Sequence, residues 1–336
     1  MDKDNSSSSD LIALPDPVAF EVAQDGSAKA VALQQLLSHV SADDKLAYSW
    51  LHIQGGHPET QNNLKRCGLD RLVIEALTAE ETRPRCSIHG SGVVLNLRGA
   101  NLNPGAQPED MVSVRLWIEH KRVIGVWMRP LRAVRDVFDA FERGQAPVTP
   151  GEFVAKLALR LADRAEPSVA ALNEQVDALE EQVLDEAAEI ERTPLAEVRR
   201  ACIVLRRFMI PQKDALTTLQ IEDVDWLSDS DRGRIREAAE RITRFGEELD
   251  AIRDRAQVIH DQIMDRRAET MNRQMLILSV VAAVFLPLGL LTGLLGINVG
   301  GVPGSDNPWA FAIVCVILVV LGALQVWWFK RMGLYR

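Results

Sequence analysis

The residues best placed to do chemistry lie near the C-terminus, where Gly296, Ile297 and Asn298 end a long apolar run. A lone amide among glycines, where an apolar helix must stop, can simply cap that helix, since Gly and Asn commonly end helices. Repeated around a symmetry axis, it would instead present a ring of carbonyl oxygens to a hydrated cation. Divalent ions such as Mg²⁺ release water reluctantly, so a ring of this kind would hold the ion through its waters.

The apolar run before this tripeptide carries a stripe of small or mildly polar residues. The stripe recurs every third or fourth position, and the positions between are mostly Leu, Val, Ile and Phe. It predicts either tight helix packing or one wall of a pore built from several subunits, in which Met275 and Leu286 would form apolar constrictions. Periodicity alone favours packing, and Asn298 at the end of the stripe favours the pore. The stripe consists of Asn272, Met275, Ser279, Ala282, Leu286, Gly289, Gly293 and Gly296.

Two apolar runs of membrane-spanning length enclose this region. Between Gln274 and Phe329 the only Asp, Glu, Lys, Arg or His is Asp306, and each run is near the ~20 residues that a spanning helix needs. The sequence therefore predicts a first span at 274–298, an extracytoplasmic loop at 299–308, a second span at 309–329 and a basic tail at 330–336.

Basic residues flank the two spans, whereas the connecting loop has no Lys or Arg. Because positive charge stays on the cytoplasmic side, both termini are predicted to be cytoplasmic, in a plasma (inner) membrane. The polar N-terminus has no apolar segment typical of a signal peptide. The flanking residues are Arg266, Arg267, Arg273, Lys330, Arg331 and Arg336.

The N-terminal part is predicted to be an α/β domain at 12–150, preceded by a disordered segment at 1–11. Strand-like stretches lie at 47–53, at 91–99 and in a hairpin at 112–130 that turns near His120.

The region 151–273 is predicted to be a helical coiled coil and stalk. An apolar seam with spacing 3, 4, 3, 4 is followed by a break at Thr193-Pro194, and 195–220 would form the antiparallel partner. A further helix, capped near Ser228, has no strong breaker before Pro287. From residue 230 to 296 it would be about 100 Å long at ~1.5 Å per residue. The seam residues are Val169, Leu172, Val176, Leu179 and Val183.

Composition argues against several classes of function. The net charge of −9 gives no electrostatic basis for nucleic-acid binding, and no phosphate-binding loop is present. The four cysteines are scattered, and the only close Cys/His pair, Cys86 and His89, is expected to pack rather than bind zinc. His260 faces either a lumen or the surface. We expect neither an enzyme nor a bound cofactor.

Taken together, the two C-terminal spans, the long preceding helix and the G-x-N tripeptide resemble the CorA family of divalent-cation transporters. LRRFMIPQKDAL (205–216) resembles its helical-domain signature, and FLPLGLLTGLLGIN (285–298) resembles its first span. The family's Mg²⁺ branch usually reads G-M-N after Tyr, whereas here Leu295 precedes Gly296 and Ile replaces Met. Residues 83–117 and GINVGGVPG (296–304) are closer to the ZntB zinc transporters.

The resemblance implies a homopentamer with a cytosolic funnel and a central pore for Zn²⁺ or another divalent cation, and either coupling to protons or passive flow driven by the membrane potential is open. Neither span contains an Asp, Glu or His to relay a proton, so protons would move through pore water, Asp306 at the outer mouth or the funnel. Alternatives are a CorA-type Mg²⁺ or Co²⁺ channel and a membrane-anchored coiled-coil scaffold. The family's selectivity motif corresponds to Gly296, Ile297 and Asn298, and its pore positions correspond to Asn272, Met275, Leu278 or Ser279, Ala282, Leu286 and Gly289.

Overall fold

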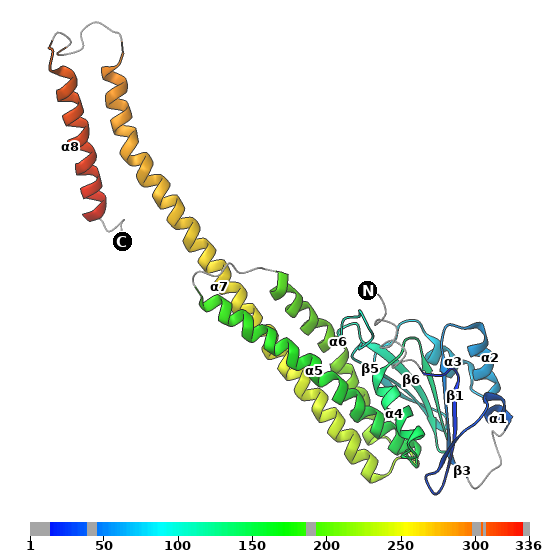
Figure 1. The fold of residues 1–336 in the computed structure, drawn as a ribbon. Helices are drawn as coiled ribbons and strands as arrows, with labels where there is room; N and C mark the ends of the chain where they lie inside the picture. Colours follow the sequence, from blue (N-terminus) through cyan, green and yellow to red (C-terminus); the bar gives the residue numbers. More distant parts are fainter. Residues whose placement is uncertain (1–13, 39–45, 186–192, 298–303, 305–306, 332–336) are drawn as a thin grey trace. The chain divides into compact units, whose positions relative to one another are not determined.

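A computed structural model describes residues 14–38, 46–185, 193–297, 304 and 307–331, which form two compact units (Figure 1). The first unit ends at Ile259 and the second begins at His260. Helix α7 (Asp229–Leu295) crosses this boundary without interruption, as the sequence predicted for one long helix. The segment predicted to be disordered, 1–11, lies outside the described residues.

The first unit contains a seven-stranded sheet in the order β2-β1-β3-β7-β6-β5-β4. Strands β3 and β7 pair in parallel, and the other neighbours are antiparallel. The predicted strands and the hairpin turning at residues 120–121 are confirmed. The strands are β1 (Val18–Ala23), β2 (Ala28–Ala30), β3 (Leu46–Gln54), β4 (Arg85–His89), β5 (Gly92–Gly99), β6 (Val112–Glu119) and β7 (Arg122–Trp127).

Helices cover both faces of this sheet, and alternate side chains of β3 fill the two cores. Leu51 and Ile53 pack in an aliphatic cluster with α2 (Pro58–Arg66) and α3 (Arg71–Thr78). Trp50, on the opposite face, contacts rings from β1, α4 (Arg132–Glu142) and α5 (Pro150–Leu184). Burial of large aromatic surfaces on this second face anchors the sheet to α4 and α5. A short helix, α1 (Leu33–Ser38), packs against the aliphatic cluster formed with α2 and α3.

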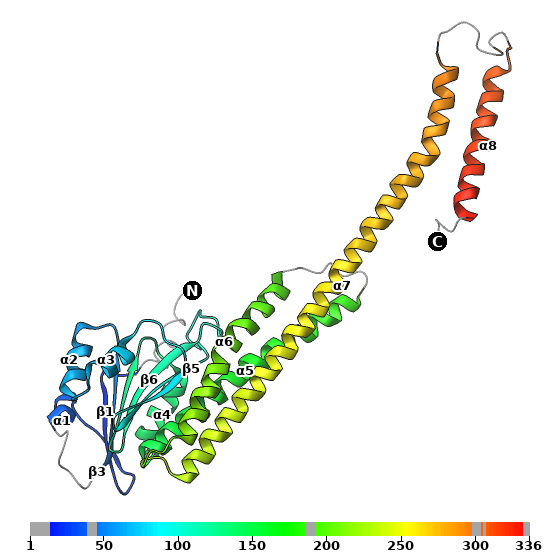
Figure 2. The same ribbon diagram turned by 180° about the vertical axis from the view of Figure 1, so that it is seen from behind.

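Helices α5, α6 (Thr193–Ile221) and α7 lie side by side in both views (Figures 1 and 2). The seam predicted on α5 is buried at all five positions. Thr193 begins α6 instead of only breaking the coil, because Pro194 suits the first turn of a helix. Gln212, on the buried side of α6, accepts a hydrogen bond from the Arg98 backbone N–H at 2.6 Å, which ties the coil to strand β5.

Helix α7 buries apolar residues in a strict seven-residue repeat, at positions a and d. We call this the seam face. Arg241 and Arg255 flank it and form ion pairs with acidic residues of α5, including Asp163 at 2.7 Å and Glu180 at 2.6 Å. These contacts hold α7 against α5. The seam face consists of Ile235, Ala238, Ile242, Phe245, Leu249, Ile252, Ala256, Ile259 and Ile263.

The second unit contains the C-terminal part of α7 and helix α8 (Ala310–Arg331). Both are long and apolar enough to cross a membrane, and no residue of their most apolar stretches is buried. Pro287 lies inside α7 and does not end it. The helix ends at Leu295, close to the Gly296 end predicted from the sequence.

Candidate functional site

The stripe predicted from the sequence lies on one exposed side of α7. Asn272, Met275, Leu278, Ser279, Ala282, Leu286, Gly289, Gly293 and Gly296 are all exposed. By contrast, the half-buried residues in this part of the helix are Val280, Val284, Leu288 and Leu291.

Among the half-buried residues, Leu288 faces helix α8. A Cβ atom placed on Gly322 of α8 would lie 3.9 Å from the Leu288 side chain, so the two helices approach each other here. At 100° per residue, these residues lie roughly 180° around α7 from the stripe. The small residues of the stripe therefore do not serve the contact with α8, and the simplest packing interpretation has no partner within the described part of this chain.

The stripe belongs to the same heptad frame as the coiled coil. Seven-residue steps from Glu240 pass through Asp261 and reach Met275, Ala282 and Gly289. The seam face continues in the same way, since Val280, Val284 and Leu291 occupy a or d positions. We call the opposite side, positions c and f, the stripe face.

The f positions of the stripe face are acidic as far as Asp261, which lies just past the boundary between the two units, whereas the c position Arg244 is basic. Glu240, Glu247, Asp254 and Asp261 are exposed at seven-residue spacing along α7. Composition shows the surplus of acids, but their alignment with the stripe becomes visible only when burial defines the heptad positions. The exposed c and f positions of α7 thus change from carboxylates to small and mildly polar residues along the chain.

The end of α7 is closed by backbone hydrogen bonds. The Gly296 N–H donates to the carbonyl oxygens of Thr292 at 2.9 Å and Gly293 at 3.2 Å. A Cβ on Gly296 would lie 3.0 Å from the Thr292 oxygen, which favours glycine at this position. Ile297 is exposed. Asn298 and Asp306 lie outside the described residues, so the amide ring and the outer-mouth acid stay predictions.

One polar residue of the spans, Gln325, was not predicted from the sequence to be functional. Gln325 lies on the half-buried side of α8, and its Oε1 has no hydrogen-bond partner among the described residues. An unpaired amide at this depth requires a water or another chain to satisfy it. The signal available in the sequence was a single amide side chain within an otherwise apolar run.

The Cys86 and His89 pair does not form a metal site. The two residues are three apart on β4, so their side chains leave opposite faces of the strand. The His89 ring contacts the Asp70 carboxylate, and burial raises the pKa of the Cys86 thiol to about 12. A protonated thiol is a poor zinc ligand. Within the described residues, no group of three His, Cys, Asp or Glu side chains is arranged to hold a metal ion.

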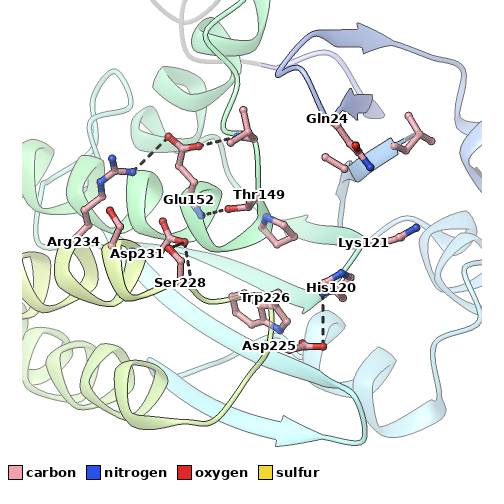
Figure 3. Close-up of a pocket in the computed structure, with 15 residues that line it drawn as sticks. Gln24, His120, Lys121, Thr149, Glu152, Asp225, Trp226, Ser228, Asp231 and Arg234 are labelled. Carbon is pink, nitrogen blue, oxygen red and sulfur yellow. Dashed lines mark hydrogen bonds and ion pairs between the residues drawn. The ribbon is translucent and has the colours of Figure 1, made fainter. Parts of the chain in front are cut away.

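A cavity of about 580 Å³ lies in the first unit where α5 and α7 begin (Figure 3). Its carboxylates already serve the two helix ends. Glu152 accepts the Val148 N–H at 2.8 Å and its own N–H donates to Thr149, while Asp231 accepts from the Ser228 hydroxyl at 2.6 Å. These side chains therefore cap the starts of α5 and α7 and are not gathered as ligands for an ion.

At the open side of this cavity, His120 of the β6–β7 turn lies 3.8 Å from Asp225 (Figure 3). Both side chains are exposed, so the pair adds little stability. Near them, the buried Trp226 N–H has no partner among the described residues.

Comparison with known proteins gives consistent matches over most of the chain. The family of CorA-like Mg²⁺ transporter proteins matches residues 45–331. A divalent cation transporter, CmaX of Pseudomonas aeruginosa, is 40% identical over 286 residues, 84% of this chain and 86% of the relative. The zinc transport protein ZntB of Pectobacterium carotovorum is 36% identical over 283 residues, with coverage of 84% and 86%. The solved structure of full-length CmaX matches with a TM-score of 0.81 at 37% identity, covering 94% of this chain and 97% of that one.

Proposed function

Because the chain belongs to the family of CorA-like Mg²⁺ transporter proteins, we propose that it carries divalent cations across a membrane through a pore lined by α7. Zn²⁺ is the favoured ion, since relatives at 36% identity are named zinc transport proteins. Mg²⁺ and Co²⁺ are the alternatives, and the relative at 40% identity is named only for divalent cations.

The observation that carries this proposal is the division of α7 into two opposite faces. The seam face is covered by α5 and α6 along the first unit and is half-buried at Val280, Val284 and Leu291 in the second. The stripe face is exposed from Glu240 to Gly296 and changes from acidic to small. A side of this composition suits a water-filled path that attracts cations and then lets them pass.

A single α7 supplies only one side of such a path, so transport requires a closed ring of copies. The proposed assembly is a homopentamer, and native mass spectrometry in detergent would reveal its mass. Small residues at Ala282, Gly289 and Gly293 would keep the ring open, while Met275 and Leu286 would form apolar constrictions. The ring of Asn298 amides at its end would bind the hydrated ion.

The membrane orientation follows from the flanking charges. Lys330 and Arg331 end α8, and Arg273 lies just before the apolar part of α7. By the positive-inside rule, these residues support an orientation in which both termini lie on the cytoplasmic side of an inner membrane. The acidic stripe face would then draw cations to the cytoplasmic end of the pore.

Proton coupling would have to work without a titratable group inside the spans. Neither 275–297 nor 309–329 contains Asp, Glu, Lys, Arg or His. Protons would therefore travel in pore water or load on Asp306 and the acidic stripe face. A pH gradient across liposomes should increase zinc flux if this coupling operates.

Adjacent alanines provide a matched test of the pore. Ala282 lies on the stripe face, and Ala283 lies about 100° away around the helix. Ala282→Leu should narrow the pore and reduce radiolabelled zinc flux into liposomes by tenfold or more, which corresponds to an increase of about 1.4 kcal/mol in the free-energy barrier to passage. Ala283→Leu should retain nearly wild-type flux.

Assembly of both variants is checked by native mass spectrometry before flux is measured. Equal flux in the two assembled variants would reject the α7 pore, and so would a monomer that still transports. Parallel assays with Mg²⁺ and Co²⁺ identify the preferred ion. Absence of flux for all three in well-assembled wild-type protein would favour the scaffold.

A further inference from the structure

The seam face of α7 is interrupted by arginines between its two apolar parts. It is buried at Ile263 and half-buried again at Val280. The d positions between them are Arg266 and Arg273. Arg273 is exposed and forms no ion pair with any described residue. An exposed guanidinium without an ion-pair partner, just before the apolar part of α7, requires an anionic or aqueous partner.

Helix α8 ends with two more cations and an aromatic ring. Lys330 and Arg331 occupy its last turn, and the Arg331 guanidinium carbon lies 5.4 Å from the centre of the Trp327 ring. Neither cation forms an ion pair with a described residue. Trp at the end of an apolar helix is typical of the boundary between hydrocarbon and headgroups. The cation–π contact holds Arg331 beside this boundary.

The three cations lie near one end of the α7–α8 hairpin. Figures 1 and 2 show α8 running back along the C-terminal part of α7, and Leu288 lies opposite Gly322. The two helices run in opposite directions, and Arg331 follows Gly322 on α8 by as many residues as Ser279 precedes Leu288 on α7. Arg331 and Ser279 therefore lie at the same level of the hairpin. Arg273 is six residues further along α7, or roughly 9 Å at 1.5 Å per residue. The flexible side chains of the three cations can therefore reach the same headgroup layer.

We propose that Arg273, Lys330 and Arg331 bind the phosphate of an anionic phospholipid, whose acyl chains lie along the apolar surface beside Trp327. Charge complementarity selects the headgroup, and the adjoining apolar helices select a lipid over free phosphate. The proposal rests on the membrane placement in the proposed function. It adds a specific lipid site that neither transport nor the pore requires.

The test uses full-length protein in detergent with added phosphatidylglycerol, phosphatidylcholine or inorganic phosphate, and native mass spectrometry to measure bound lipid. Phosphatidylglycerol should bind more tightly than phosphatidylcholine, and phosphate should not displace it. Each basic residue near an anionic surface contributes a factor of about five, so Arg273→Gln with Arg331→Gln should weaken binding by about 25-fold. Arg331→Lys, which keeps the charge, should retain binding.

The matched control is Arg267→Gln, which removes an exposed charge about 120° around α7 from Arg273. It should change the affinity for phosphatidylglycerol less than twofold. Equal binding of the two lipids, an equal loss in this control, or displacement of lipid by inorganic phosphate would overturn the proposal.

Zinc flux in liposomes of phosphatidylcholine alone separates this proposal from the transport function. Flux without selective phosphatidylglycerol binding would refute only the lipid site. Selective binding without flux for any divalent ion would refute only transport.

Discussion

His52 should make the first unit sensitive to mild acid. The ring is fully buried on β3 beside Trp50, and its Nδ1 has no hydrogen-bond partner among the described residues. Burial lowers the pKa of His52 from 6.5 to about 3. The opposing residue on β7 is Gly125, where a Cβ would lie only 2.1 Å from this nitrogen, so the site has no room for a counter-ion.

The sign of the effect follows from which state binds the proton. Below pH 6.5 the unfolded chain protonates at His52, whereas the folded chain stays neutral until pH approaches about 3. The free energy of unfolding therefore falls as pH falls, by about 1.4 kcal/mol per pH unit within this window. Between pH 7 and pH 5 the expected loss from His52 alone is about 2 kcal/mol.

Urea unfolding of the detergent-solubilised protein, followed by tryptophan fluorescence, measures this loss. Wild type and His52→Leu are compared in the same buffers, so that every other titrating group cancels. The control is His89→Gln, which removes an exposed histidine paired with Asp70. If His52→Leu loses as much stability as wild type between pH 7 and pH 5, the buried neutral ring does not determine the acid response.

Two further outcomes test the stalk and the end of α7. Arg255→Gln should lower the free energy of unfolding by about 1 kcal/mol, and by less in high salt, because its ion pairs with Asp177 and Glu180 are partly exposed. The control Arg253→Gln, whose partner Asp254 lies on α7 itself, should change the free energy of unfolding little. A loss in Arg255→Gln that does not depend on salt would contradict an electrostatic cause. Asn298→Ala should abolish zinc flux while the oligomer stays intact, whereas wild-type flux per assembled protein would identify Asn298 as a helix cap.

Local patterns in the sequence predicted the elements that depend on local spacing. The 3, 4 repeat from Val169 to Val183 and the alternation in 112–130 correspond to the observed α5 seam and the β6–β7 hairpin. The parallel pairing of β3 with β7 was not predictable, because it joins Trp50 to Val123 across α2, α3 and three strands. Long-range pairing of this kind leaves no short-range periodicity to detect.

The candidate site was predictable in part for a similar reason. The stripe is visible because small residues contrast with the Leu, Val and Ile around them. Helix α8 is apolar on every side, so its sequence does not indicate which face meets α7. The contact between Leu288 and Gly322 identifies that face, and it thereby shows that the stripe is directed elsewhere. The contact between Gln212 of α6 and strand β5 was also not predictable, since a polar residue at a buried position resembles a surface residue in sequence.

The unbroken heptad frame of α7 has a geometric consequence for any ring of copies. An ideal α-helix drifts by about 20° per heptad relative to a seven-residue repeat, so the eight heptads from Glu240 to Gly296 accumulate about 160°. The carboxylates and the small residues can face one axis only if the helices wind around it with a left-handed superhelical twist. In the proposed ring, unwinding that twist would turn Met275 and Leu286 away from the axis, so that rotation of the helices would widen the pore.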